Sequence, residues 1–200
     1  MPQLLDSTDL EVHPDYRMFG IGDIDPLGDG GPPVPGPGWL GVGRSAVLVG
    51  AGEQLVYPNV RLELWDEPPP APTEHEVQET VRLHLPTGEL CLDEITAGGV
   101  PDIFQVPPGI YTVRITAWER ESTRAAFEAL RSQGGDLDWE DPAYLELHGR
   151  EWYLFQFWLE QGTARLLDGS GVMVHAGYPR IAISMRAPQP GARLPAAGEA

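Results

Sequence analysis

The most chemically distinctive stretch of the 200-residue sequence is GGDLDWEDP, in which four carboxylates surround one indole. Closely spaced carboxylates attract a positively charged protein surface, and a tryptophan among them can anchor the contact. The alternative is a solvated loop with its tryptophan packed into the core. The spacing predicts a protein-binding segment, and we expect its contacts to come from five residues: Asp136, Asp138, Trp139, Glu140 and Asp141.

Motifs that carry covalent catalysis do not occur in the sequence. Ser45 and Ser170 lie in GRSAV and DGSGV, which lack the glycine spacing of a nucleophile elbow. There is no HExxH, no phosphate-binding glycine loop and no dinucleotide fingerprint. A carboxylate pair across a cleft leaves no sequence signature, so a hydrolase of the glycosidase kind stays an alternative. We expect a protein that is not an enzyme and binds no cofactor.

Two combinations of metal-ligating residues fall short of a site. The segment that begins Asp23-Ile-Asp25 resembles a calcium loop, but Leu27 and Val34 occupy the fifth and twelfth positions, where such a loop needs oxygen ligands. His84 and Cys91 would supply only two of the four ligands of a structural zinc ion. We expect an acidic turn at the first place, ordinary strand residues at the second, and no metal.

The charge of the chain narrows the class of partner. The formal net charge is −17, and all 13 basic residues are arginine. A field of this sign repels phosphate backbones and anionic lipid, which disfavours nucleic acid and membrane surfaces. It favours a basic protein partner, although solubility alone would also account for the charge.

The single cysteine and the first residues of the chain indicate in which cellular compartment the protein is expected. Cys91 has no second cysteine with which to form an internal disulfide. The opening residues, MPQLLDSTDLEV, do not form a signal peptide, and no apolar run approaches 18 residues. We therefore expect a cytoplasmic protein.

Short alternating segments separated by Gly- and Pro-rich turns make up most of the sequence. They predict strands, and one stretch rich in Glu, Arg, Ala and Leu, residues 119–133, predicts a helix that ends at Gly134 and Gly135. The fold class that follows is mainly β: an antiparallel β-sandwich or flattened barrel of about eight strands with one inserted helix. The segments expected to be strands are 15–23, 45–50, 60–65, 77–85, 89–95, 111–118, 151–160, 171–176 and 180–186.

Two of these strands and two turns give more specific predictions. In 111–118 every second residue is apolar, which indicates one buried face, and 151–160 is apolar on both faces, which predicts a central strand lying against it. Pro108-Gly109 predicts a type II turn. Pro86-Thr87-Gly88 predicts a hairpin that pairs 77–85 with 89–95.

The expected organisation is one folded body with loose ends. We predict a frayed acidic N-terminus at 1–14, a single β-sandwich domain at 15–187 and a disordered tail at 188–200. Within the domain, 20–43 is a Gly/Pro-rich loop, and 119–148 is an insertion made of the helix and the acidic loop.

The order of motifs is similar to that of the ComJ-type competence nuclease inhibitor family and of related uncharacterised actinobacterial-type β proteins. The motifs are DYRMFGIGD, the small-residue strand ending at Gly50, VRLELW, VQETVRLHL, FQVPPGIYTVRITAW and EWYLFQFW, which together cover residues 15–118 and 151–159. The resemblance implies a small cytoplasmic all-β protein that binds and inhibits a DNA-entry nuclease. The insertion at 119–148 and some 40 residues after the aromatic strand depart from the pattern.

The sequence therefore favours an acidic, cytoplasmic protein-binding module, such as an inhibitor or immunity protein for a basic nuclease. A carbohydrate-binding or structural sandwich is a second possibility, in which tryptophans such as Trp65 and Trp118 form an aromatic platform on one sheet. A hydrolase with a carboxylate pair is the third.

Overall fold

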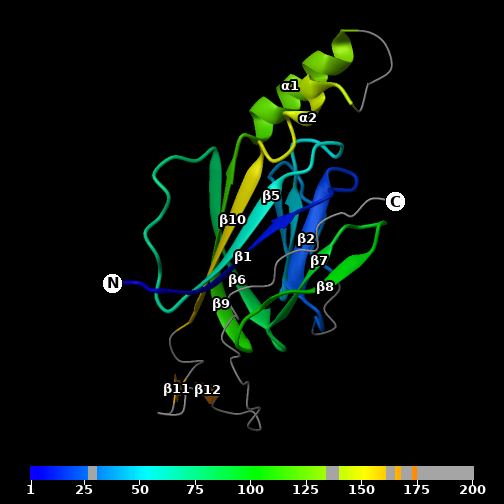
Figure 1. The fold of residues 1–200 in the computed structure, drawn as a ribbon. Helices are drawn as coiled ribbons and strands as arrows, with labels where there is room; N and C mark the ends of the chain where they lie inside the picture. Colours follow the sequence, from blue (N-terminus) through cyan, green and yellow to red (C-terminus); the bar gives the residue numbers. More distant parts are fainter. Residues whose placement is uncertain (27–30, 134–139, 161–164, 168–172, 175–200) are drawn as a thin grey trace, which may run out of the picture.

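Two five-stranded sheets pack face to face in the computed structural model, and two helices stand at one end of them (Figure 1). The structure describes residues 1–26, 31–133, 140–160, 165–167 and 173–174. Both large sheets keep free edges, so the strands in these ranges form a sandwich and not a closed barrel. The predicted mainly β class and sandwich architecture are confirmed.

The first sheet contains the longest strands. All neighbours in it are antiparallel except β10 and β5, which run parallel, so the predicted antiparallel arrangement holds with one exception. Its order is β1 (Leu4–Glu11), β5 (Asn59–Trp65), β10 (Trp152–Leu159), β9 (Gly109–Trp118) and β6 (Val77–Leu85).

The second sheet is wholly antiparallel. Its order is β3 (Leu40–Val42), β4 (Ala46–Gly50), β2 (Met18–Asp23), β7 (Glu89–Asp93) and β8 (Gly99–Gln105). A separate short pair consists of β11 (Arg165–Leu167) and β12 (Met173–Val174).

The aromatic strand β10 lies at the centre of the first sheet, as its two apolar faces predict. Its neighbour β9 is antiparallel to it, with Phe155 opposite Ile115 and Phe157 opposite Val113. These side chains are fully buried in the core between the sheets. Burial of such side chains contributes about 1.5–3 kcal/mol each, so this pair of strands supplies a large part of the folding free energy.

Both turns predicted from Pro and Gly are wrong in the same way. β6 ends at Leu85 in the first sheet and β7 begins at Glu89 in the second, so residues 86–88 cross between the sheets and do not close a hairpin. Residues 106–108 likewise connect β8 in the second sheet to β9 in the first. Gly109 does not have the positive φ of a type II turn and opens β9 instead.

The crossings are possible because strands on either side present apolar residues to one shared core. Leu85 before the first crossing and Leu90 after it are both fully buried, although they belong to different sheets. Alternation of apolar residues is the same for a hairpin and for a crossing of this kind. His84 and Cys91 consequently lie on different sheets, which separates the two residues considered as a zinc pair.

The N-terminus is a strand, which corrects the prediction of a frayed segment at 1–14. β1 pairs with β5 from Leu4 to Glu11, and Val12 after it is fully buried. The strand lies at the edge of the first sheet, and most of its side chains are exposed, so its sequence lacks a clear apolar alternation. The predicted strand 180–186 and tail 188–200 lie outside the described residues.

The insertion contains two helices where one was predicted. α1 spans Arg120–Ser132 and α2 spans Pro142–Leu145. A second, smaller apolar cluster attaches both helices to the end of the sandwich through Val56, Phe127, Tyr144 and Leu147. In Figure 1 the two helices project from this end, with α1 extending away from the sheets.

Candidate functional site

Two of the five residues of the predicted contact segment lie in the described part of the chain. Glu140 is exposed, and Asp141 is half-buried. Asp141 caps α2, because its Oδ1 accepts a hydrogen bond from the Ala143 amide at 2.8 Å. Asp136, Asp138 and Trp139 lie outside the described residues.

The start of α1 is held by a carboxylate from a distant part of the sequence. Glu76 accepts hydrogen bonds from the Arg120 amide at 2.7 Å and from the Glu121 amide at 3.3 Å. These are amides of the first helical turn, which have no partner within the helix. Glu76 therefore fixes where α1 leaves the sheet, and with it the arginines on that turn.

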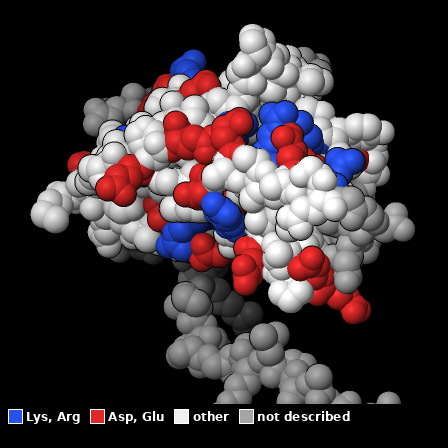
Figure 2. Space-filling model, turned by 90° about the horizontal axis from the view of Figure 1, so that it is seen from above, with Lys and Arg blue, Asp and Glu red and all other residues white. Residues whose placement is uncertain are grey.

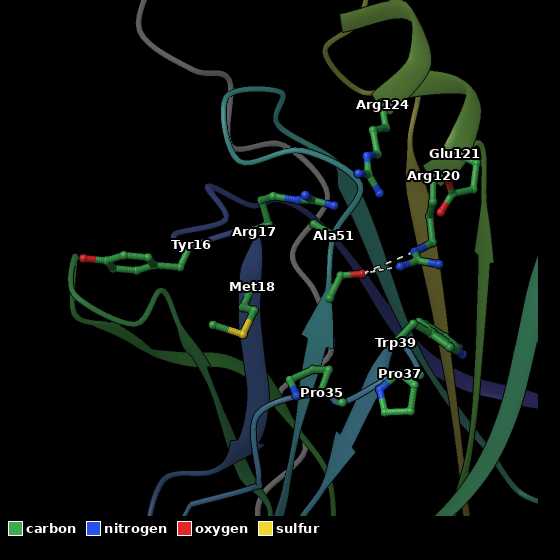
Figure 3. Close-up of a pocket in the computed structure, with 13 residues that line it drawn as sticks. Tyr16, Arg17, Met18, Pro35, Pro37, Trp39, Ala51, Arg120, Glu121 and Arg124 are labelled. Carbon is green, nitrogen blue, oxygen red and sulfur yellow. Dashed lines mark hydrogen bonds between the residues drawn. The ribbon is translucent and has the colours of Figure 1, made fainter. Parts of the chain in front are cut away.

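An open hollow of about 540 Å³ lies between this helical turn and the edge of the second sheet. Four segments line it: the turn before β2, residues 35–39, the end of β4 and the beginning of α1. It receives three arginines, Arg17, Arg120 and Arg124, from elements far apart in the sequence (Figure 3). We call it the arginine hollow.

Arg120 forms one fixed wall of the hollow. Its Nε and one terminal nitrogen donate to the Gly50 carbonyl oxygen at 3.3 and 2.7 Å, shown as dashed lines in Figure 3. Its guanidinium carbon lies 5.4 Å from the ring centroid of Trp39. The cation–π contact and the two hydrogen bonds hold this guanidinium in one orientation.

Arg17 and Arg124 point toward one another across the hollow (Figure 3). Arg124 donates from Nε to Glu128, one turn further along α1, at 3.2 Å. The Nε of Arg17 is buried and has no acceptor among the described residues, and no ion pair joins Arg17 to a carboxylate in those ranges. Arg17 is thus a cation without a charge partner in the described part of the molecule.

The backbone that presents Arg17 is strained. Asp15 and Met18 exchange two hydrogen bonds of 2.9 Å around a two-residue turn, and both central residues, Tyr16 and Arg17, have positive φ, at 50° and 61°. A turn of this shape normally takes Asn-Gly, because side chains with a full Cβ substituent are disfavoured there. Such strain concentrates at functional positions.

We expect Tyr16→Asn to raise the free energy of unfolding by about 1 kcal/mol, because Asn tolerates positive φ far better than Tyr. Tyr16 is 66% exposed, so little burial is lost with its ring. Urea denaturation of the full chain measures the change, with Tyr16→Phe as the control that keeps the strain. A Tyr16→Asn variant less stable than the wild type would contradict the prediction.

A buried carboxyl group, that of Glu151, contacts Gly52, which directly follows Gly50 and Ala51 in the lining of the hollow. Glu151 is fully buried, and its Oε1 accepts a hydrogen bond from the Gly52 amide at 2.9 Å and another from the Tyr153 hydroxyl. Burial raises the pKa of Glu151 to about 7, although both hydrogen bonds and the Arg120 charge act in the other direction. The second oxygen, Oε2, has no partner among the described residues.

Glu63, a second buried glutamate, has the opposite environment. Burial disfavours its charge, but hydrogen bonds from Arg61, Gln156 and Trp65 outweigh burial and lower the pKa of Glu63. Glu63 is thus an ionised member of a network on the outer face of the first sheet. Its lowered pKa is the opposite of what a general acid at neutral pH needs.

The tryptophans considered as a sugar-binding platform lie on that same outer face. Trp118 stacks on Trp152 with ring centroids 3.8 Å apart and planes 2° apart, and its indole N–H donates to the Glu74 carbonyl oxygen. Trp65 donates to Glu63 at 2.9 Å. Both rings are half-buried and take part in contacts within the chain.

The described ranges contain no group of three His, Cys, Asp or Glu side chains that could hold a metal ion. Asp23 illustrates why: both of its oxygens accept hydrogen bonds from the chain itself, including two from Thr87. Burial, followed by the charges of Asp93 and Asp23, raises the pKa of the Cys91 thiol, which keeps it a poor nucleophile.

Sequence reasoning did not find the arginine hollow. Arg17, Trp39 and Arg120 are spread over more than half of the chain and meet only through the pairing of β2 with β4 and the docking of α1. One signal was present: Arg120 and Arg124 are four residues apart on the predicted helix and share a face. Another was the turn DYRM, which lacks the usual Asn or Gly.

The surface around the helices is mixed in charge. Figure 2 views the molecule from the helical end and shows acidic side chains spread over this face, with basic ones among them in a few places. Among the described residues, no helix is both long and apolar enough to cross a membrane.

Two solved structures are similar to this chain at low identity. ComJ from Bacillus subtilis, described as an inhibitor of the DNA-degrading activity of NucA, is 14% identical, with 80% of this chain and 99% of ComJ covered and a TM-score of 0.48. The protein of crocagin biosynthetic gene J is 18% identical, with 80% and 99% covered and a TM-score of 0.45. No protein-family model matches the sequence, and no curated protein matches it. Similarity at this level does not carry a function from one chain to another.

Proposed function

We propose that this chain is a non-catalytic, cytoplasmic module that binds a basic protein, and that it serves as an inhibitor or immunity protein for a basic nuclease. One observation carries the proposal. The acidic connection between α1 and α2 belongs to a helical pair that projects from the sandwich, in a chain of net charge −17.

The ends of that connection support a role in binding. α1 is tied to the sheet at its first turn by Glu76 and ends at Ser132, and α2 begins again at the Asp141 cap. The connection therefore starts and returns at two anchored helices. We assign the partner contact to Asp136, Asp138, Trp139, Glu140 and Asp141, with the carboxylates steering and the indole anchoring.

We propose a nuclease as the partner because of the charge of its substrate groove. A nuclease that holds a phosphate backbone presents arginine and lysine along its substrate groove, and an acidic protein surface competes for that groove. The similarity of the motif order to the ComJ-type inhibitors points to the same class of partner.

We expect neutralisation of the four acids to slow association with the partner and to flatten its salt dependence. The variant is Asp136→Asn, Asp138→Asn, Glu140→Gln and Asp141→Asn, and the last of these keeps a side-chain oxygen that can still cap α2. Affinity capture from the native host at low salt identifies the partner. Association rates measured from low to high ionic strength then compare the two chains, and we expect about a tenfold slower rate for the variant at low salt.

A matched control removes the same charge elsewhere: Asp25→Asn, Glu67→Gln, Glu79→Gln and Asp102→Asn, all at exposed positions. We expect this control to lose less of the association rate than the segment variant. DNA hydrolysis by the captured partner gives the second measurement, since the wild-type chain should suppress it. An unchanged association rate in the segment variant, or a partner whose activity the wild-type chain leaves untouched, would refute the proposal.

A further inference from the structure

The arginine hollow has the size of a small-molecule site. Its volume of about 540 Å³ falls within the range of roughly 300–1,000 Å³ that is usual for ligand pockets. Apolar groups line part of it, among them Pro35, Pro37 and Trp39, while the arginines line the side toward α1 and the β2 turn. One wall can therefore cover a flat or apolar group and the other can bind charge.

The charges in the hollow do not cancel. Three arginines and one carboxylate, Glu121, line it. Arg120 and Arg124 have carboxylate partners in Glu76, at 3.8 Å, and Glu128. Arg17 has none within the described ranges, and its buried Nε lacks an acceptor. A chain with 30 acidic residues has ample carboxylates to pair with one arginine, so its unpaired state beside a hollow is informative.

The geometry of Arg120 prepares the site for an anion. Gly50 and Trp39 hold its guanidinium in one orientation, while Glu76 pairs with it at 3.8 Å. Arg17 lies opposite, on a turn whose two central residues, Tyr16 and Arg17, both have positive φ. Guanidinium groups arranged in this way bind phosphate or carboxylate oxygens by two parallel hydrogen bonds.

We propose that the arginine hollow binds a small organic oxyanion, a phosphate monoester or a polycarboxylate, with its charged group between Arg17 and Arg124 and its remaining part against Trp39. This site is separate from the segment 136–141 and goes beyond the proposed function. Binding here requires no basic protein partner, so its test stands on its own.

Isothermal titration calorimetry of the full chain with AMP, citrate and adenosine tests the proposal. AMP carries the phosphate and citrate the carboxylates, while adenosine is the neutral counterpart of AMP. Binding of AMP alone identifies a phosphate site, binding of citrate alone a carboxylate site, and binding of both a general oxyanion site. Each of these three results supports the proposal, provided that adenosine does not bind.

Charge-removing variants locate the site. Arg17→Gln and Arg124→Gln should each weaken the anion that binds by about tenfold, since each removes a charge-assisted contact. Arg82→Gln, at the far edge of the first sheet where Arg82 pairs with Glu160, should leave the affinity unchanged. Thermal unfolding of each variant confirms that it is folded. If only one of Arg17→Gln and Arg124→Gln folds, that variant alone is enough to locate the site.

Three results would overturn the proposal. The first is no heat of binding with 10 mM AMP or citrate. The second is binding that both hollow variants retain in full. The third is binding that Arg82→Gln weakens as much as Arg17→Gln does, because the anion would then be attracted by exposed arginines in general.

Discussion

Asp23→Ala is expected to lower the free energy of unfolding by about 3–4 kcal/mol, because this carboxylate accepts hydrogen bonds from residues 86–88, where the chain crosses between the sheets. Asp23 is 2% exposed. One oxygen accepts from the Thr87 amide at 3.0 Å and the Gly88 amide at 2.9 Å, and the other from the Thr87 hydroxyl at 2.8 Å. An alanine leaves these donors without an acceptor inside the protein.

The second crossing depends on the first. The Val106 amide donates to the Gly88 carbonyl oxygen at 2.8 Å, so the connection from β8 to β9 rests on the connection from β6 to β7. Gly88 has a φ of +74°, and a Cβ there would lie 1.9 Å from the Val106 carbonyl oxygen. Asp23 therefore supports both crossings through a residue that cannot be other than glycine without rearrangement.

Urea denaturation of Asp23→Ala gives the measurement, and two further variants separate the contributions. Thr87→Val removes only the hydroxyl donor and should cost about 1 kcal/mol. Asp23→Asn keeps the shape but turns one acceptor into a donor facing an amide, so it should resemble Asp23→Ala more than the wild type. A loss of less than about 1 kcal/mol for Asp23→Ala would show that the crossings are held by packing alone.

The crossings also show where sequence reasoning reached its limit. Alternation in 77–85 and 111–118 correctly predicted strands with buried Leu83 and Val113, because period 2 depends only on which face meets the core. It could not predict the partner of each strand. Asp23 lies 64 residues from Thr87 in the sequence and accepts its amide at the crossing, and nothing in the local sequence of Asp23 indicates this contact.

The parallel pairing of β5 and β10 is a second strand pairing that the sequence does not predict. Local turn residues predict antiparallel neighbours, since only neighbours in sequence can form hairpins. Residues 59–65 and 152–159 are far apart, and their pairing follows from the burial of Phe155 and Leu62 in one core. The central place of β10 was predictable because both of its faces are apolar. That β5 would be one of its two neighbours was not predictable from the sequence.

The acidic segment and the arginine hollow also differ in how far the sequence predicts them. An acidic segment is visible in sequence because its residues are contiguous. The arginine hollow joins the β2 turn, the segment before β3 and the first turns of α1, and its chemistry exists only once those elements meet. Glu151 gave no signal in EWYLFQFWLE, since only its burial beside Tyr153 distinguishes it from any other glutamate.

Glu151→Gln is expected to stabilise the protein above neutral pH by up to about 3 kcal/mol and to leave it unchanged near pH 4. The pKa of Glu151 is about 7 in the folded chain against an ordinary value of 4.5. Between these values the folded state binds more protons than the unfolded state, so this residue lowers stability as pH rises from about 4.5 to 7. Above pH 7 the penalty is complete and constant.

Glutamine reproduces the protonated side chain, because its carbonyl oxygen can accept the bonds from Gly52 and Tyr153 without carrying charge. Subtracting the unfolding free energies of wild type and variant at each pH cancels the other titrating groups. The difference should grow through the window from about pH 4.5 to 7 and then level off.

Glu63→Gln is the matched control. Burial disfavours the charge of this second buried glutamate, but hydrogen bonds from Arg61, Gln156 and Trp65 outweigh burial and lower its pKa. Its contribution to stability is present above the ordinary glutamate pKa and is lost as pH falls through the folded value. Glu63→Gln should therefore destabilise the chain at neutral pH, by about 1–2 kcal/mol, and lose this effect in acid. Two buried glutamates in one sandwich would then show opposite pH profiles, and a Glu151→Gln difference that is flat in pH would mean that Glu151 stays ionised in its buried position.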